Sequence, residues 1–366
     1  MKLIVGIKLK KAREDIGLTQ EAFAEAVGLS SEYISLLESG KRTPSLETLT
    51  NISEYLKKEI SFFVRKKGSA FDILIEGKRL DNYAKRELKK FQKYCEEYVN
   101  LEELAGRCLE LAPLYSHVSA GRMADEERCR LGLKNEPIRD IFSLLELNGC
   151  RVVRQPIPEE SQVSGVFIFL EEKEASFALI NSIQSLGQQA FTAAHEYCHY
   201  LKDRSEGPII DNPDIFVDEF LSLYHPREKF AQAFAAQFLM PPSKISEIVD
   251  KDLRSNKLRF EDVIYLKRYF GVSTFDMLRT LKKLGYLSVT KFEGYLENDP
   301  DFHEEALFGN LEDERRPKRV KGRIVLSDRF KTLAIKAYQK KKISVEKLSE
   351  LLNQDKDKLV LLLSKS

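Results

Sequence analysis

Two histidines and a glutamate stand close together in the run AAHEYCHYL, where His195 and His199 are four residues apart and Glu196 follows the first. Side chains four residues apart lie on the same face of an α-helix, so both imidazoles can reach one metal ion. Glu196 would then point toward a water on that metal, where a general base is needed. The flanking residues are apolar, which predicts a largely buried helix. The alternative is a chance occurrence of this pattern on a core helix.

A third ligand is expected after the motif, because a catalytic zinc site has three protein ligands and one position open to water. The next helical pattern runs from Arg227 to Met240, between Pro226 and Pro241, and has Glu228 in its first turn. Glu228 is therefore the predicted third ligand. The alternative is an ordinary first-turn glutamate that the helix dipole stabilises.

The other candidate ligands between these two helices rank lower. His225 precedes Pro226 in a predicted loop, and no further histidine stands at the spacing typical of metzincins. Cys198 lies about 100° around the helix from His199 and is interpreted as a packing residue. The carboxylates of the intervening stretch are interpreted as solvated: Asp211, Asp214, Asp218 and Glu219.

These residues resemble the ImmA/IrrE family of zinc metallopeptidases, which act on phage-type repressors in bacteria and their mobile elements. The resemblance covers roughly residues 128–285. Its segments correspond to the family's opening helices at Arg128–Cys150, its edge strand at Phe177–Asn181, its metal helix at Phe191–His199, its third-ligand helix at Glu228–Pro241 and a following helix pair at Gly271–Gly285.

The resemblance implies that His195, His199 and Glu228 are Zn²⁺ ligands and that Glu196 is the catalytic acid/base. The chain departs from the family's pattern at Gln232, where Asn or Asp is usual, and in the longer loop that follows the metal helix. Neither departure removes a ligand, although the first concerns the shell of residues that orients the ligands.

A second group of motifs lies near the N-terminus, where residues 6–64 contain short helical patterns separated by turn residues. One helix is predicted over Gln20–Val27 with Thr19 as its N-cap, and Gly28 follows at a turn where positive φ is expected. A further helix is predicted over Ser31–Glu38. In a helix-turn-helix of this kind, the second helix of the pair enters the major groove of DNA.

The stretch Gly17–Ser45 resembles the XRE/Cro-type helix-turn-helix family, which implies DNA as a partner. Bases or sugar edges would then face Ser30, Ser31, Glu32, Tyr33 and Ser35. Phosphates would contact Thr19, Gln20, Lys41 and Arg42. The alternative is a small helical bundle used for protein contacts, since the module is only mildly basic. Such domains commonly bind paired half-sites as dimers, so a homodimer or another partner is expected.

Composition limits the broad class of protein. The 366 residues suggest two or three domains. A content of 43% hydrophobic and 32% charged residues is typical of a soluble chain with hydrophobic cores. A net charge of +2 does not by itself imply a nucleic-acid partner, so any basic patch must be local. Five cysteines without a CxxC pair indicate reduced thiols and a cytoplasmic location. No apolar run approaches the roughly 18 residues of a membrane helix, so no membrane contact is expected.

The chain is predicted to be mainly α with a small β-sheet (α+β). A helix-turn-helix domain at 1–67 would be followed by a helical linker at 68–120 and a metallopeptidase domain at 121–289. An acidic connection and a small C-terminal helical unit would occupy 290–366. A long amphipathic pattern from Leu80 to about Leu111 indicates either a helix packed on its own chain or a dimerising hairpin.

The last part of the chain alternates between charged and amphipathic stretches. Residues 290–314 are acidic and are expected to form a mobile connection. The basic run Arg315–Arg323 is interpreted as a solvated linker that could add phosphate contacts. Three short amphipathic helices are predicted to follow, around Arg329–Tyr338, Glu346–Leu352 and Lys356–Leu363.

Together these patterns predict a cytoplasmic regulator of a bacterium, phage or mobile element. Its DNA-binding domain is joined to a zinc-dependent endopeptidase that cleaves a phage-type or stress-response repressor. The rival hypothesis is a DNA-binding regulator whose metal site is structural or sensory and cleaves nothing. A third hypothesis is the antitoxin-like or stress-sensing half of a two-gene system. An open fourth coordination position would separate the first two hypotheses.

Overall fold

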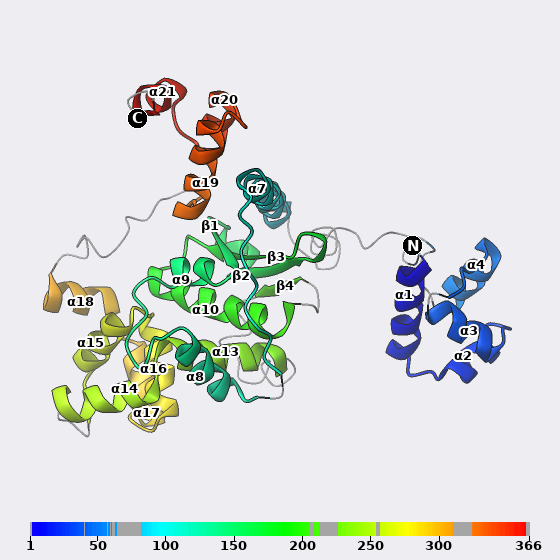
Figure 1. Ribbon diagram of the computed structural model, residues 1–366. Coiled ribbons are helices and arrows are strands. Elements are labelled where there is room, and N and C mark those ends of the chain that lie inside the picture. Colours follow the sequence, from blue (N-terminus) through cyan, green and yellow to red (C-terminus); the bar gives the residue numbers. More distant parts are fainter. Residues whose placement is uncertain are drawn as a thin grey trace. The chain divides into compact units, whose positions relative to one another are not determined.

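The computed structural model describes residues 2–39, 41–56, 58, 60, 63, 82–116, 118–204, 208–211, 226–253, 257–309 and 324–363. Tertiary contacts divide the chain into two compact units, Met1–Asp72 and Ile73–Ser366. Figure 1 shows a helical first unit and a second unit with helices around one small sheet. The prediction of a mainly α protein with a small sheet is therefore confirmed.

The first unit contains short helices, and those after the first begin at capped positions. They are α1 (Lys2–Asp15), α2 (Gln20–Ala26), α3 (Ser31–Glu38) and α4 (Leu46–Tyr55). Side chains of Thr19, Ser30 and Ser45 accept hydrogen bonds from the backbone N–H groups at the starts of α2, α3 and α4. These caps satisfy donors that have no partner within the helix, so the predicted starts of α2 and α3 are confirmed.

The core of the first unit lies between α1, α3 and their neighbours. Phe23, Ile34 and Ile52 are fully buried within it. Gly6 allows α1 to approach α3 closely, because a Cβ at this position would collide with the carbonyl oxygen of Leu37. Gly28 has φ 68° at the turn between α2 and α3, as predicted, since glycine adopts this conformation without a steric penalty.

The second unit is built on a four-stranded sheet with the order β1-β3-β2-β4. Its strands are β1 (Cys150–Gln155), β2 (Gly165–Leu170), β3 (Ala175–Asn181) and β4 (Ile209–Asp211). Strand β3 pairs parallel with β1 and antiparallel with β2, and β2 pairs antiparallel with β4. The prediction that Phe177–Asn181 forms an edge strand is wrong. Every residue of β3 is buried, because the strand has a neighbour on each side and a helix over each face.

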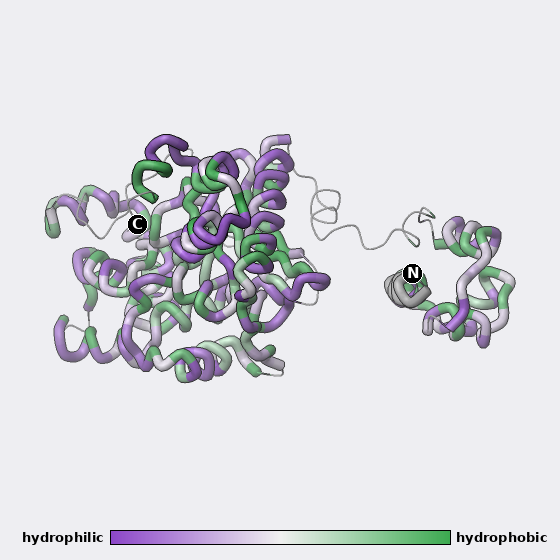
Figure 2. Tube along the Cα trace, turned by 45° about the horizontal axis from the view of Figure 1, so that its top comes forward, coloured by the Kyte–Doolittle hydropathy of each residue, from purple (hydrophilic) through white to green (hydrophobic). Residues whose placement is uncertain are grey.

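One face of the sheet is covered by α10 (Leu186–Lys202) and by α9 (Ile141–Leu147), and the other by α7 (Asn82–Ala105). Helix α10 packs on β2 and β3, and α13 (Pro226–Leu239) packs on the far side of α10. Helix α8 (Ala120–Arg130) in turn packs on α13. Figure 2 shows apolar residues concentrated inside this unit and hydrophilic residues along its outer helices. Helix α10 is thus held in the most buried layer.

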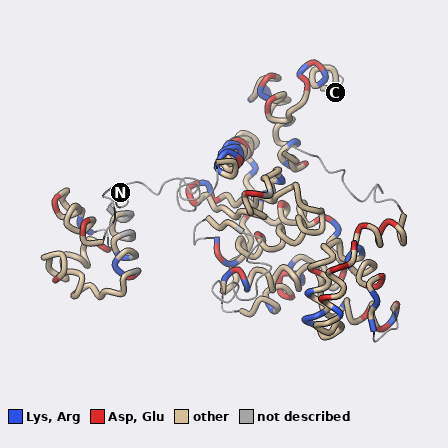
Figure 3. Tube along the Cα trace, turned by 180° about the vertical axis from the view of Figure 1, so that it is seen from behind, with Lys and Arg blue, Asp and Glu red and all other residues tan. Residues whose placement is uncertain are grey.

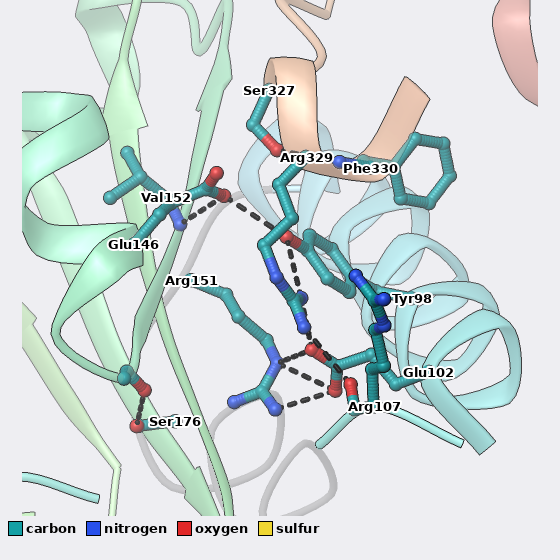
Figure 4. A network of polar contacts seen from close by, with 11 residues as sticks. Tyr98, Glu102, Arg107, Glu146, Arg151, Val152, Ser176, Ser327, Arg329 and Phe330 are labelled. Atoms are coloured by element: carbon teal, nitrogen blue, oxygen red, sulfur yellow. Dashed lines mark hydrogen bonds and ion pairs between the residues drawn. The ribbon is translucent and has the colours of Figure 1, made fainter. Parts of the chain in front are cut away.

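Helix α7 packs on its own chain, as the first of the two sequence interpretations proposed. The ring of Phe91 meets the Phe177 ring of β3 edge-on, with centroids 6.4 Å apart. On another side, Tyr94 stacks on Phe330 of α19 (Asp328–Gln339) at 4.6 Å. A buried polar network joins α7 to β1 and α19 (Figure 4): the Glu102 carboxylate accepts hydrogen bonds from Arg151 of β1 at 3.0 Å and from Arg329 of α19.

Residues 290–308 do not form the mobile connection that their acidic composition suggested. Helices α17 (Val289–Leu296) and α18 (Pro300–Phe308) occupy this stretch. The reason is tertiary: Glu304 of α18 is fully buried and forms ion pairs with Lys267 and Arg268 of α15 (Phe260–Phe270). The predicted basic run Arg315–Arg323 lies outside the described residues.

The remaining elements are short. The three predicted C-terminal helices are confirmed as α19, α20 (Val345–Leu352) and α21 (Lys356–Leu363). The others are two 3₁₀ turns, η1 (Glu159–Ser161) and η2 (Glu171–Lys173), the helices α14 (Pro242–Ile248) and α16 (Thr274–Lys283), and a π-helical turn η4 (Val249–Leu253).

Candidate metal centre and nucleic-acid interface

Helix α10 carries the HExxH pattern through the core of the second unit. Its first turn is fixed by a capping box, in which the Ser185 hydroxyl accepts from the Gln188 backbone N–H and the Gln188 side chain accepts from the Ser185 N–H. From Phe191 to Leu201 every residue of the helix is buried. His195, Glu196 and His199 are each 0% exposed, so the polar groups of the pattern are buried among apolar side chains.

Donor atoms from α10 and α13 converge on one point. His195 Nε2 lies 3.1 Å from His199 Nε2 and 3.1 Å from Glu228 Oε2, and His199 Nε2 lies 3.4 Å from the same oxygen. Tetrahedral ligands at about 2.0–2.2 Å from a zinc ion are themselves separated by roughly 3.3–3.5 Å. The spacing and the His/His/Glu donor set therefore fit a metal ion, and the structure brings together the three ligands predicted from the sequence.

The Glu228 carboxylate is held in its charged form. Its burial would raise the pKa, but hydrogen bonds and electrostatic interactions with His195 and His199 outweigh burial and lower the pKa well below its usual range. Arg227 adds a positive charge 3.7 Å from the other carboxylate oxygen. An ionised carboxylate is the form that ligates a cation, so this glutamate is prepared for metal binding.

Asp203 completes the centre and was not among the residues that the sequence singled out. Its Oδ2 lies 2.8 Å from His199 Nδ1, and its backbone N–H donates to the His199 carbonyl at the end of α10. A carboxylate at Nδ1 holds the proton there and leaves Nε2 free to coordinate. The sequence did contain a signal of this contact, because Asp203 follows His199 by four residues and so lies one helical turn further along.

Glu196 lies against the sheet rather than among the three converging donor atoms. Its side chain approaches Gly165 of β2 so closely that a Cβ there would collide with Glu196 Oε1 and with Thr192 Cγ2. Gly165 is therefore a second residue that sequence reasoning missed. A lone glycine at the start of a strand carries no signal of a close approach until the helix that crosses it is known.

Gln232, the departure from the family's pattern, is buried one turn after Glu228 on α13. Its side-chain oxygen accepts a hydrogen bond from Arg279 of α16 at 3.3 Å. The lower-ranked ligand candidates His225, Asp214, Asp218 and Glu219 lie outside the described residues, and Asp211 is described only through its backbone in β4.

The residues predicted to contact bases lie on α3 and at its start. Ile34 and Leu37 are buried, which fixes the rotation of α3 and leaves Ser31, Glu32 and Ser35 exposed on the opposite face. Together with residues of α2 these exposed side chains line a shallow hollow of about 450 Å³: Thr19, Gln20, Glu21, Ser31, Glu32 and Ser35. The hollow brings three of the five predicted base contacts beside two of the four predicted phosphate contacts, Thr19 and Gln20.

Several of these side chains already have partners within the first unit. Thr19 and Ser30 accept hydrogen bonds as N-caps, and the Arg42 guanidinium lies over the Tyr33 ring at 4.9 Å. The Gln20 side chain donates to Glu38 at 2.7 Å. A phosphate contact at Gln20 is therefore left to its backbone N–H at the start of α2. Lys41 is exposed.

None of the helices in the described part of the chain is long and apolar enough to cross a membrane. Comparison with protein families matches residues 9–63 to the helix-turn-helix family and residues 147–282 to the IrrE N-terminal-like domain, a peptidase family. The second match contains His195, Glu196, His199 and Glu228.

Curated proteins with similar sequences include three regulators or control proteins. An uncharacterized HTH-type transcriptional regulator, y4dJ of Sinorhizobium fredii, is 38% identical over 15% of this chain and 73% of its own length. The control protein C.MunI of Mycoplasma sp is 46% identical over 14% of this chain and 73% of its own length. An SPbeta prophage-derived uncharacterized HTH-type transcriptional regulator, YonR of Bacillus subtilis, is 32% identical over 19% of this chain and 63% of its own length.

The two families match in the order predicted from the sequence, and each matched segment lies within one compact unit. The chain therefore belongs to the XRE-type helix-turn-helix family through its first unit and to the ImmA/IrrE peptidase family through its second.

Proposed function

We propose that this protein is a DNA-binding transcriptional regulator whose second unit is a zinc-dependent endopeptidase. One observation carries the enzymatic part: the donor atoms of His195, His199 and Glu228 converge, while Glu196 follows His195 on α10 and is outside that group. Three ligands and a separate carboxylate are what metal-assisted hydrolysis of a peptide bond needs.

His195 and His199 would hold Zn²⁺ through Nε2 and Glu228 through Oε2, with Asp203 holding His199 in the ligating tautomer. When bound, zinc supplies a Lewis acid that polarises a carbonyl group and lowers the pKa of water toward about 7. Burial of the donor atoms strengthens these interactions, because the local dielectric constant is lower than that of water.

Glu196 would act as base and then as acid. Its carboxylate takes a proton from the attacking water as the new C–O bond forms at the peptide carbonyl. It then returns that proton to the amide nitrogen as the C–N bond breaks, and the acid proton passes to the amine, so the products leave as a carboxylate and an ammonium group. The apolar residues around α10 limit competing proton exchange with bulk water.

The first unit supports the regulatory part of the proposal. It presents exposed polar side chains on α3, and its relatives y4dJ and YonR bear the names of transcriptional regulators. We infer that it binds operator DNA as a homodimer and that the substrate is a repressor of the phage or stress-response type. The prophage origin of YonR is in keeping with this substrate class.

A second candidate function is favoured by the burial of the site. His195, Glu196 and His199 are all 0% exposed, which would suit a structural or sensory metal site that cleaves nothing. Substitution of Glu196 separates the two functions. Glu196→Gln retains size and metal ligands but has no carboxylate to accept a proton.

The test compares wild type and Glu196→Gln in cells that also carry the repressor genes neighbouring this gene. The wild type should produce a cleaved repressor and derepression, and the variant should lower the cleavage rate about 10²–10⁴-fold. Glu247→Gln, an exposed glutamate of α14, is the matched control and should behave as wild type. If both Glu196 forms derepress equally and mass spectrometry finds no fragment, the structural or sensory function is correct.

A further inference from the structure

The first three turns of α7 carry a dense group of basic side chains, which we call the basic face of α7. It lines a shallow, open depression of about 550 Å³ formed by Asn82, Lys85, Arg86, Lys89, Lys90 and Lys93. Figure 3 shows this concentration of lysine and arginine on the helix. The opposite side of α7, with Ala84, Leu88 and Phe91, is buried against the second unit, so the basic face is the side that points away from the core.

The arrangement of these charges opposes the stability of the helix. The positive end of a helix dipole lies at its N-terminus, where basic residues are unfavourable. Lys85, Lys89 and Lys93 are also four residues apart, a spacing at which like charges repel. Four of the five acidic residues of α7 lie instead in its second half, where the dipole disfavours them: Glu96, Glu97, Glu102 and Glu103. A helix selected only for its fold would place the two signs the other way.

Few of these charges are neutralised within the protein. Lys90 pairs with Glu87 at 2.6 Å and Lys93 with Glu350 at 2.7 Å, both at the surface. Within the described part of the chain, Lys85, Arg86 and Lys89 form no ion pair. Exposed ion pairs are weak, so Lys90 and Lys93 can exchange their partners for an external anion. The basic face therefore offers up to five cations to a ligand.

We propose that the basic face of α7 is a second nucleic-acid contact surface, which binds the phosphate backbone of duplex DNA without reading its sequence. Lys85, Lys89 and Lys93 form a line with one cation per helical turn, about 6 Å apart, which suits a regularly repeated anion. Asn82 and Tyr83, which is 66% exposed, add hydrogen-bonding groups of the kind that contact phosphates.

The choice of DNA rests on the proposed function of the first unit. Both units are parts of one chain. DNA bound by the first unit would therefore be present at high local concentration near α7, so even weak phosphate contacts would add to the overall affinity.

The experiment uses the full-length chain and a random duplex of roughly 30 bp, with affinity measured between about 50 and 200 mM salt. Lys85→Gln/Arg86→Gln/Lys89→Gln should weaken binding at least tenfold at the lowest salt. It should also reduce the slope of log K against log salt by about 2–3, because each lost phosphate contact removes about 0.9. The control Lys251→Gln/Lys257→Gln/Lys283→Gln removes the same charge from exposed positions in η4, before α15 and at the end of α16, and should leave the slope unchanged.

Two further comparisons distinguish a failure of this proposal from a failure of the proposed function of the first unit. Lys41→Gln/Arg42→Gln removes contacts of the first unit alone. If DNA binding depends on the basic face but not on Lys41 and Arg42, the second surface stands and the operator function of the first unit fails. An unchanged slope in the α7 variant overturns the second surface, whatever the first unit does. Capture of a polyglutamate probe by the wild type in place of DNA would also overturn it, in favour of an acidic protein partner.

Thermal unfolding distinguishes a binding role from a structural one. Relief of repulsion on α7 should leave the melting temperature of the triple variant unchanged or raised. A lowered melting temperature together with weaker binding would assign these residues to the fold and overturn the proposal.

Discussion

Glu196 and Glu228 are both buried carboxylates of the second unit, yet their surroundings differ. Glu228 lies within 3.4 Å of two imidazole nitrogens, whereas Glu196 lies against Gly165 of the sheet. The difference follows from helix geometry, because His195 and His199 share one face of α10 while Glu196 is rotated by about 100° from His195. Adjacent residues of α10 therefore lie inside and outside the group of converging donor atoms.

At this scale the sharpest prediction concerns Asp203. Asp203→Asn should weaken zinc binding about 10–100-fold, because the amide no longer holds the proton on His199 Nδ1 as a carboxylate does.

His195→Ala/His199→Ala should abolish stoichiometric zinc binding, since two of three ligands are lost. Competition with a chromophoric chelator measures both affinities.

Asp250→Asn, at an exposed aspartate of η4, is the matched control and should bind zinc as wild type does. Wild-type affinity in Asp203→Asn would show that the contact with His199 is only packing. Full zinc retention in Glu228→Ala would point to a different third ligand.

At the scale of elements, α3 shows how a helix is oriented for contact with a partner. Ser30 caps its start, and Ile34 and Leu37 bury its inner face, so the exposed face is determined by the core. Arg42 over the Tyr33 ring links the end of the motif to the middle of α3. The helix thus presents a preorganised polar face.

Substitutions in this motif should have two kinds of effect on DNA binding: loss of preference for the operator, or equal loss of affinity for all DNA. Ser31→Ala/Tyr33→Phe should reduce the preference for operator over random DNA by about 1–3 kcal/mol per lost base contact, with little change on random DNA. Lys41→Gln/Arg42→Gln should weaken binding to both DNAs alike and reduce the salt slope by about 2.

Electrophoretic mobility shifts on promoter fragments from the protein's own locus measure both effects. Lys10→Gln on α1 is a control, because this exposed lysine only forms a distant pair with Glu14. Absence of salt-dependent binding by any form would favour the alternative of a protein-contact bundle.

At the scale of the whole molecule, the C-terminal helices are attached to the second unit through a buried ionic network (Figure 4). Glu102 is 2% exposed and accepts from both Arg151 and Arg329, while the Arg329 guanidinium also donates to the Arg107 carbonyl at 3.0 Å. Nearby Glu146 is buried, which raises the pKa of its carboxyl, although hydrogen bonds from Ser327 and Val152 oppose this. The network joins residues more than two hundred positions apart.

Arg329→Ala should therefore release α19 from α7 and make the C-terminal helices susceptible to proteolysis. Removing one partner of a buried ion pair typically costs about 3–5 kcal/mol, and the partial exposure of Arg329 places this case at or below the lower end. Lys331→Ala on the same helix is the control, since its pair with Asp328 is exposed. Limited proteolysis followed by mass spectrometry measures the difference, and equal cleavage rates would contradict a role for the network in attachment.

The local features of this protein could be predicted from sequence because they depend on neighbours a few residues away. The starts of α2 and α3 follow from Thr19 and Ser30, and the shared face of His195 and His199 follows from the helical repeat. The predicted α+β class and both families are likewise confirmed, because they depend on residue patterns that persist along the chain.

Only the tertiary structure decided the features that depend on residues far apart in sequence. Phe177–Asn181 became an interior strand because β1 and β2 pair on either side of it. The acidic stretch after residue 289 became helical because Lys267 and Arg268 neutralise the buried Glu304. Gly165 acquired its role from a helix that crosses it thirty positions later. The pattern of side chains shows which face of an element is apolar, but tertiary packing determines which partner covers that face.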